Sequence, residues 1–215
     1  LGLVVQSHIN KYEDLKNTSL AVDALSTGFA FMLREMLEIN GIDHDSYELI
    51  PVGATKARLD SLISGEHSGA LLNPPFTEFA EAAGLKIIDN SQSALPTCQI
   101  GVMAACRGWA KENPEALRGF IKAELQAIEW ISNQENSDSA TKILLNKIPG
   151  MDIKAAEAAM QIMLDPIQGI AESEKINMEG VKTILDLRSK FGEPKKELNN
   201  PELYIDLTYY DSARD

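Results

Sequence analysis

The fold is decided by Asp14–Asn90, which reads DLKNTSLAVDALSTGFAFMLREMLEINGIDHDSYELIPVGATKARLDSLISGEHSGALLNPPFTEFAEAAGLKIIDN. Short apolar runs alternate in it with runs of helical period. The strand candidates are Ser19–Asp23, Tyr47–Val52, Gly69–Asn73 and Leu85–Asp89, and the helix candidates between them are Gly28–Asn40, Thr55–Ser64 and Pro75–Ala83. Strands and helices in alternation predict a mostly parallel sheet with helices on its faces, so we expect a three-layer α/β lobe.

Three turns of this lobe are candidates for ligand binding, because open α/β sheets bind ligands where a strand ends and the next helix begins. The candidate residues in these turns are Asp23, Ser26, Thr27, Gly28, Thr55, Asn73 and Phe76. Hydroxyls and free helix N–H groups suit an anion, whereas the carboxylate of Asp23 suits an amine or a hydroxyl. The residues alone leave a structural alternative open, in which the polar side chains cap helices and Phe76 belongs to the core.

The rest of the chain differs in character on the two sides of this stretch. Leu1–Gln6 and Cys98–Ala105 are further strand candidates. Amphipathic helices are expected at Trp109–Ser132, with a restart at Asn113-Pro114, and at Ser137–Ile148, Asp152–Leu164 and Asn177–Phe191. We therefore expect an α/β part over residues 1–105 and a helix-rich part over residues 106–215.

Composition excludes several classes of partner. The 215 residues are 44% hydrophobic and 24% charged, as in ordinary globular proteins. The net charge of −12 argues against nucleic acid and against anionic lipid surfaces, since both need a basic footprint. Apolar runs do not approach the ~20 residues of a membrane span, so direct membrane insertion is not expected.

The residue types that carry catalysis do not form a recognisable site. His8, His44 and His67 lie in polar turns without metal-ligand spacing, so we interpret them as surface histidines. Cys98 and Cys106 flank a predicted strand of roughly 26 Å, too far apart for a disulfide within the chain, and neither has a histidine beside it in sequence. We therefore expect no enzyme activity, no cofactor and no metal.

The order of several segments resembles a known family. LAVDALSTGFAFMLREML, YELIPVGATKARLDSLISGE and GALLNPPF are similar to the second lobe of periplasmic substrate-binding proteins of ABC importers. The resemblance is to the nitrate/sulfonate/taurine and thiamine-pyrimidine-precursor-like group. IGVMAACRGWAKENPEALRGFIKAELQAIEWI resembles that family's return strand and long helix, and YIDLTYYDSA resembles its C-terminal element.

The resemblance implies a type II periplasmic-binding fold, in which two α/β lobes are joined by two crossover strands and enclose the ligand. Leu1–Gln6 and Ile100–Ala105 would be the crossovers, residues 1–105 lobe two, and 106–215 a return to lobe one. The implied function is that of a solute-binding protein, which captures a small polar or anionic organic molecule by hinge closure and delivers it to a membrane permease. The implied location is periplasmic or extracellular, and a lipid anchor is compatible with it. With this resemblance, ligand contact is favoured over simple capping for Ser26, Thr27 and Asn73.

The sequence departs from the family at its beginning. It contains no signal-peptide features, it starts inside the apolar run LGLVV, and the opening part of lobe one is absent. We interpret this as a chain that lacks its natural beginning. Two alternatives stay open: an enzyme resembling the thiamine pyrimidine synthases, which use a cysteine-rich motif and a lysine-bound cofactor, and a ligand-sensing domain of a larger regulator.

Overall fold

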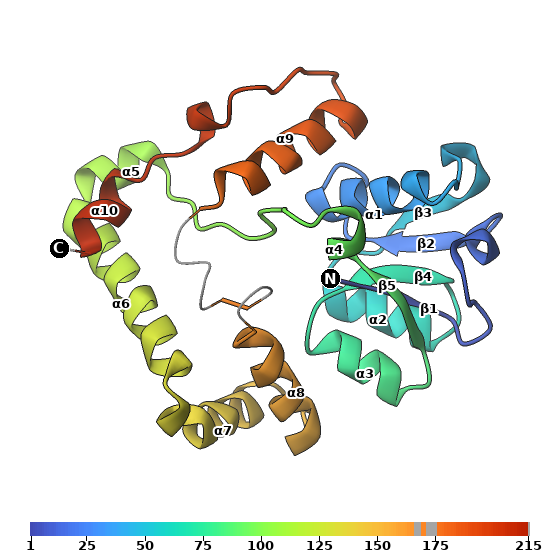
Figure 1. The fold of residues 1–215 in the computed structure, drawn as a ribbon, viewed down its shortest axis with the longest axis horizontal. Coiled ribbons are helices and arrows are strands. Elements are labelled where there is room, and N and C mark those ends of the chain that lie inside the picture. The colour runs from blue at the N-terminus through green and yellow to red at the C-terminus, as the bar shows by residue number, and fades with distance from the viewer. Residues whose placement is uncertain (166–168, 171–175, 215) are drawn as a thin grey trace. The chain divides into compact units, whose positions relative to one another are not determined.

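The computed structural model describes residues 1–165, 169–170 and 176–214 (Figure 1). The chain forms two compact units. The first unit comprises Leu1–Cys98 and Glu179–Asn199, and the second comprises Gln99–Met178 and Asn200–Asp215. Each unit therefore contains segments that are distant in sequence.

A mixed five-stranded sheet forms the centre of the first unit. Its strands are β1 (Gly2–Val5), β2 (Ser19–Val22), β3 (Glu48–Pro51), β4 (Gly69–Leu72) and β5 (Lys86–Asn90), in the order β3-β2-β4-β1-β5. β2 runs parallel to both β3 and β4, as predicted. β1 runs antiparallel to β4 and to β5, so these two strands share one direction. The carboxyl ends of β2, β3, β4 and β5 consequently meet at one edge of the sheet.

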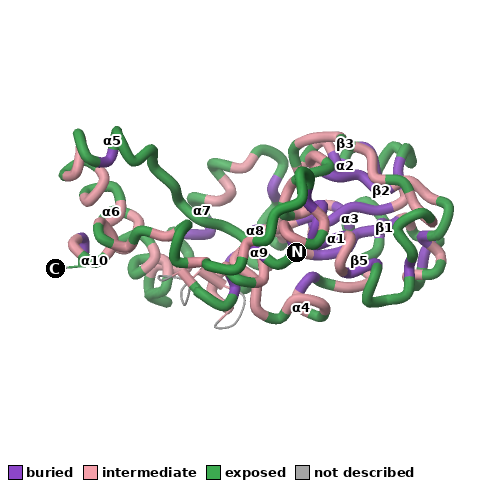
Figure 2. Tube along the Cα trace, turned by 90° about the horizontal axis from the view of Figure 1, so that it is seen from above, coloured by how far each residue is buried: buried purple, intermediate pink, exposed green. Residues whose placement is uncertain are grey.

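Helices cover both faces of this sheet, and side chains alternate between the faces as they do along any strand. Its regular helices are α1 (Gly28–Ile39), α2 (Thr55–Ile63), α3 (Phe76–Ala82), α4 (Ser91–Ala94) and α9 (Met178–Phe191), with 3₁₀ turns at Tyr12–Leu15 and His44–Ser46. Leu3, Leu20 and Leu71 pack with α1 on one face. Val4, Ala21 and Leu72 pack with α2 and α3 on the other. The expected three-layer α/β arrangement is confirmed, and Figure 2 shows its buried residues concentrated in the strands and α1.

α9 packs with the first unit, although it follows the helices of the second in sequence. The rings of Phe191 and Phe31 stack with their centroids 6.4 Å apart. Lys190 Nζ lies 2.7 Å from Glu35 and 2.9 Å from Glu38, both on α1. Helical periodicity identifies the apolar face of such a helix but not its partner, which explains why the sequence placed it with residues 106–215. The assignment of the two parts to lobes of a binding protein stays a prediction.

The second unit is helical over its described residues. Its elements are α5 (Arg107–Glu112), α6 (Pro114–Ser132), a 3₁₀ turn at Gln134–Asn136, α7 (Ser137–Lys147), α8 (Ile153–Met163), a 3₁₀ turn at Pro201–Tyr204 and α10 (Thr208–Arg214). As predicted, one helix ends before Asn113 and a new helix begins at Pro114. α10 packs along α6, and α7 packs against α8. α6 is amphipathic but contains no buried residue, as the pink and green colouring along it in Figure 2 shows.

The predicted strand at Cys98–Ala105 is wrong. No regular secondary structure is assigned to these residues. Ile100, Val102 and Met103 are exposed to 46%, 63% and 64%. A strand forms only where a neighbouring strand accepts its backbone hydrogen bonds, and the apolar composition of the segment does not supply that partner. The expected second crossover strand at Ile100–Ala105 is therefore an irregular segment.

Candidate functional site

The three candidate turns lie side by side because of the strand order. β2 is the middle strand of the parallel trio, with β3 and β4 as its neighbours. Val22 pairs with Pro51, so the turns that begin at Asp23 and Val52 leave the sheet at the same level. Asn73 follows the last residue of β4. We call the edge formed by these three turns the binding edge.

The first turn ends in a capped helix. Thr27 is the N-cap of α1, and its hydroxyl oxygen accepts a hydrogen bond from the backbone N–H of Ala30 at 3.3 Å. The same hydroxyl donates to Asp23 Oδ1 at 2.5 Å. Ser26 and Gly28 are exposed beside it. The first N–H groups of a helix have no acceptor within the helix, so α1 presents free donors beside an exposed hydroxyl.

The second turn differs from expectation in its cap. Ala54 is the N-cap of α2, and the Thr55 side chain makes no capping bond. The Thr55 hydroxyl instead donates to Asn73 Oδ1 at 3.1 Å, which joins the second turn to the third. Gly53 has a φ of +102°, a left-handed conformation that glycine adopts without the clash of a Cβ.

The third turn places an amide and an aromatic ring at the edge. Asn73 Nδ2 donates to the carbonyl of Pro74 at 3.0 Å, while its Oδ1 accepts from Thr55. Phe76 is half-buried and meets Phe79 edge to face, with the ring centroids 6.1 Å apart. Phe76 also packs against the core between the sheet and α2, so much of its surface is used inside the fold.

Arg58 connects these turns and was not recognised in the sequence. Its exposed fraction is 2% although it lies on α2, next to the buried Leu59. Its Nη1 donates to the Gly53 carbonyl at 2.6 Å, and its Nη2 donates to Thr55 Oγ1 at 3.2 Å and to the Leu71 carbonyl at 3.3 Å. The available signal was its position: Arg58 precedes Leu62 by four residues and so shares the buried face of the helix.

The electrostatics of the binding edge are set by one buried cation and one carboxylate. Burial lowers the pKa of Arg58, and the nearby Asp23 carboxylate opposes that shift. The guanidinium also lies over the ring of Phe29 at 5.7 Å, so it reaches the first turn as well. Thr55 and Asn73 are thus joined by a hydrogen bond, Ser26 and Thr27 lie in the neighbouring turn, and contact of these residues with a ligand stays a prediction.

The residues set aside in the sequence divide into two groups. His8 and His44 are exposed, as expected. His67 is not a surface residue: it is 8% exposed, and its Nδ1 lies 3.0 Å from Ser19 Oγ. The polar residues around His67 in sequence did not predict this contact with Ser19, which lies at the edge of the sheet opposite the binding edge. In the described ranges, no group of three or more His, Cys, Asp or Glu residues is arranged to hold a metal.

The two cysteines are free thiols. Cys98 is half-buried, and burial raises its pKa to about 11. It is therefore protonated at neutral pH, whereas nucleophilic cysteines act as thiolates. Cys106 is exposed.

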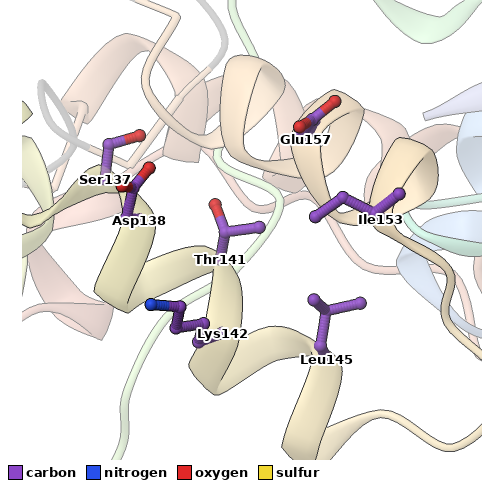
Figure 3. A pocket seen from close by; sticks show the side chains of 7 residues that line it. All are labelled: Ser137, Asp138, Thr141, Lys142, Leu145, Ile153 and Glu157. Atoms are coloured by element: carbon purple, nitrogen blue, oxygen red, sulfur yellow. The ribbon is translucent and has the colours of Figure 1, made fainter.

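Two surface depressions are lined by residues outside the binding edge. One of about 340 Å³ is lined by Ser189, Lys195, Lys196 and Glu197. The other, of about 180 Å³, lies between α7 and α8 (Figure 3). Its lining residues are Ser137, Asp138, Thr141, Lys142, Leu145, Ile153 and Glu157. Neither depression contains a candidate residue from the sequence.

The fold, with its strand–helix turns at one edge, is shared with solved structures, and a sequence comparison shows the family. Solved structures with a similar fold include periplasmic sulfonate-binding proteins. Residues 4–145 match the model of the NMT1-like family, and the chain belongs to that family. No curated protein sequence matches it significantly. Among the described residues, no helix combines the length and the apolar character needed to cross a membrane.

Three solved structures illustrate the similarity. A putative periplasmic sulfonate-binding protein from Methylobacillus flagellatus KT is 16% identical, with a TM-score of 0.67; the match covers 99% of this chain and 64% of that one. The alkanesulfonate-binding protein SsuA from Xanthomonas axonopodis pv. citri, bound to MOPS, is 15% identical, with a TM-score of 0.68 and coverage of 92% and 66%. The desulfurization enzyme DszB is 12% identical, with a TM-score of 0.59 and coverage of 99% and 75%. The chain thus spans about two thirds of the length of the two binding proteins.

Proposed function

We propose that this chain acts as the ligand-binding component of an ABC-type import system and captures a small polar or anionic organic molecule. The observation that carries the proposal is the convergence of three strand–helix turns at one sheet edge, linked by Arg58 and the Thr55–Asn73 hydrogen bond. Membership of the NMT1-like family supports it. So do the solved structures described as sulfonate-binding proteins and as a ligand-binding component of an import system.

The proposed contacts follow from which groups are still free. The exposed Ser26 hydroxyl and the first N–H groups of α1 would donate to an anionic head group, as helix N-termini do for many anions. Asn73 has a second amide hydrogen beyond the one given to Pro74. Thr27 and Thr55 already use their hydroxyls internally, so they would place these donors rather than add to them.

The location and partner belong to the same proposal. A component of this kind works outside the cytoplasmic membrane, in the periplasm or at the cell surface, and delivers its solute to a permease. The related structures are described as periplasmic, which supports the location. The two-lobed closure mechanism would apply to the intact protein, with ligand contacts favouring the closed form.

Binding is tested first by native mass spectrometry of freshly purified protein, which detects a co-purified small molecule. Calorimetric titration with linear alkanesulfonates, matched alkanecarboxylates and matched alkylamines then ranks the head groups. The proposal expects saturable binding of an anionic series and no binding of the amines. Selective binding of amines would instead indicate that the Asp23 carboxylate selects the ligand. Absence of saturable binding across the panel, with no co-purified molecule in the native spectra, would contradict the proposal.

An enzymatic role is the alternative that a specific observation favours, since DszB shares the fold. The high pKa of Cys98 argues against a thiolate nucleophile at that position. Turnover of an organosulfur compound by the purified protein, with sulfite released into solution, or the absorbance of a pyridoxal aldimine, would support catalysis over transport.

A further inference from the structure

Arg58 has an unusual combination of burial and partners. Its side chain is almost completely removed from solvent, and the hydrogen bonds that it donates go to two carbonyls and one hydroxyl. Burial of a charge is costly unless hydrogen bonds or an opposite charge compensate it. A leucine or methionine would fill the same space without that cost. Packing alone therefore does not explain why a guanidinium is present at this position.

The partners of Arg58 lie in the second turn and on the elements that adjoin the first and third turns of the binding edge. Gly53 and Thr55 belong to the second turn, and Leu71 lies in β4, two residues before Asn73. Phe29, under the guanidinium, belongs to the start of α1. A planar guanidinium presents donors in several fixed directions, whereas a lysine ammonium is a compact charge on a flexible stem. Arg58 can therefore hold these segments at fixed positions relative to one another.

The hydrogen bond from Arg58 to Thr55 also determines how the Thr55 hydroxyl is oriented. Because the Thr55 oxygen accepts from Arg58, its single hydrogen is free to point at Asn73 Oδ1. The Asn73 amide is thereby oriented with its oxygen toward Thr55 and its nitrogen toward the carbonyl of Pro74. Without Arg58, the Thr55 oxygen loses this donor, so the direction of its hydrogen and the orientation of the amide are no longer enforced.

We propose that Arg58 is the positioning residue of the binding edge: it orients the Asn73 amide through Thr55 and holds the three turns as one preorganised surface. This role rests on the proposed function, because the edge matters only if it binds a solute. Preorganisation of this kind increases affinity, since fewer groups must be ordered when the ligand arrives.

The test compares Arg58→Met and Arg58→Lys with Lys56→Met in the intact chain. Lys56 lies on the same helix but is exposed, and its Nζ lies 2.7 Å from Asp60 Oδ2. The readout is the side-chain NH₂ signal of Asn73 in ¹⁵N NMR spectra, assigned by its loss in Asn73→Asp. Both Arg58 variants should shift or broaden this signal, and Lys56→Met should leave it unchanged. Arg58→Lys keeps a buried charge, so the comparison with Lys56→Met can still be made with this variant if Arg58→Met does not fold.

A second measurement separates this role from the proposed function. Hydrogen exchange of residues 53–58 and 71–76 should be faster in folded Arg58→Lys than in Lys56→Met. If 1-butanesulfonate binds the wild type, its affinity should fall about tenfold or more in Arg58→Lys, the size expected for loss of an enforced hydrogen-bond geometry. Absence of butanesulfonate binding bears on the proposed function, whereas an unchanged Asn73 signal and unchanged exchange in a folded Arg58 variant overturn the positioning role.

Discussion

At the scale of single residues, two glycines at the binding edge differ in whether their backbone conformation needs glycine. Gly53 adopts a φ of +102°, and Gly28 has an ordinary helical start; an added Cβ would meet no atom within 4 Å at either position. Space is therefore not the difference between them, and backbone conformation is. Their alanine variants separate the stability of the edge from its function.

Gly53→Ala should lower the free energy of unfolding by about 1–2 kcal/mol, because alanine is strained in the left-handed region. Gly28→Ala should leave stability unchanged or raise it by up to about 1 kcal/mol. Urea denaturation measures both.

If the N–H groups of α1 hold the ligand, Gly28→Ala should nevertheless weaken binding, since a methyl group then lies beside these N–H groups. Unaltered affinity in this stable variant would argue against that contact.

Thr27→Val and Asn73→Ala are predicted to weaken ligand binding without unfolding the protein. Thr27→Val also removes the cap of α1 and should cost about 1 kcal/mol of stability. Thr27→Ser keeps the hydroxyl and is the matched control. Calorimetry with the solute identified for the wild type should show affinity reduced about tenfold in each of the two variants. Asn73→Ala removes a hydrogen bond to the ligand, whereas Thr27→Val removes the side chain that positions the start of α1. Wild-type affinity in both would remove these residues from the site.

Tyr12 gives the first unit a measurable pH dependence. Its hydroxyl donates to Asp89 Oδ2 at 2.7 Å, and burial together with this bond raises its pKa above the ordinary value of 10.0. In the unfolded chain the phenol ionises near pH 10 while the folded form keeps its proton, so this contribution is complete below pH 10 and is lost as pH rises above it. Stability should therefore fall above about pH 10.

Tyr12→Phe should cost about 1–2 kcal/mol at neutral pH, because Asp89 loses a donor. It should also remove part of the alkaline decline, which urea denaturation between neutral pH and about pH 11 measures. Tyr204→Phe, at an exposed tyrosine, is the control and should retain the wild-type slope. An equal decline in Tyr12→Phe would show that other groups cause it.

At the scale of elements, the docking of α9 on α1 combines an aromatic contact with an ion pair. Phe191→Ala should cost about 2 kcal/mol, from a half-buried ring and its stacking on Phe31. Lys190→Met should cost less than about 1 kcal/mol, since its pairs with Glu35 and Glu38 are partly solvated. Hydrogen exchange along α9 measures both, and Lys182→Met, which removes the exposed pair with Asp186 on the same helix, is the control. A larger loss from Lys190 than from Phe191 would reverse this assignment.

The elements also show what the sequence could predict. Ser19–Asp23 and Gly69–Asn73 were identified because a short apolar run between turn residues is typical of a buried strand, and both turns follow where their strands end. Cys98–Ala105 has the same apolar composition but no neighbouring strand. Arg58 and His67 were missed because burial of a polar residue depends on partners distant in sequence, which composition does not reveal. The three turns of the candidate site could therefore be predicted from the sequence, but the hydrogen bonds between them could not.

At the scale of the whole molecule, periodicity predicted helices without predicting their partners. α9 packs with the sheet, and α6 presents Phe120 and Trp130 with exposed fractions of 52% and 39%. The elements assigned within residues 99–178 and 200–214 are helices, whereas the division of the chain into lobes at about residue 105 stays a prediction. The return of α9 to the first unit required knowledge of tertiary contacts.

The proposed function makes one prediction at this scale. Solute binding should compact the intact protein, because ligand contacts favour the closed form of a two-lobed binding protein. Small-angle scattering with and without a solute shown to bind by calorimetry should therefore record a smaller radius of gyration in the bound state. An Asn73→Ala sample, with weakened binding, is the control at the same solute concentration. Tight binding with unchanged dimensions would contradict hinge closure.

The position of β1 in the sheet has a consequence for how the chain acquires its structure. Gly2 pairs with Leu72 on one side and with Asn90 on the other, so an interior strand finds both neighbours only after long loops have closed. Such non-local topology slows folding, and the apolar Gly2–Val5 segment stays without partners while the chain emerges from the ribosome. Newly made chains of this protein should therefore depend on holding chaperones more than a helical protein of equal length would.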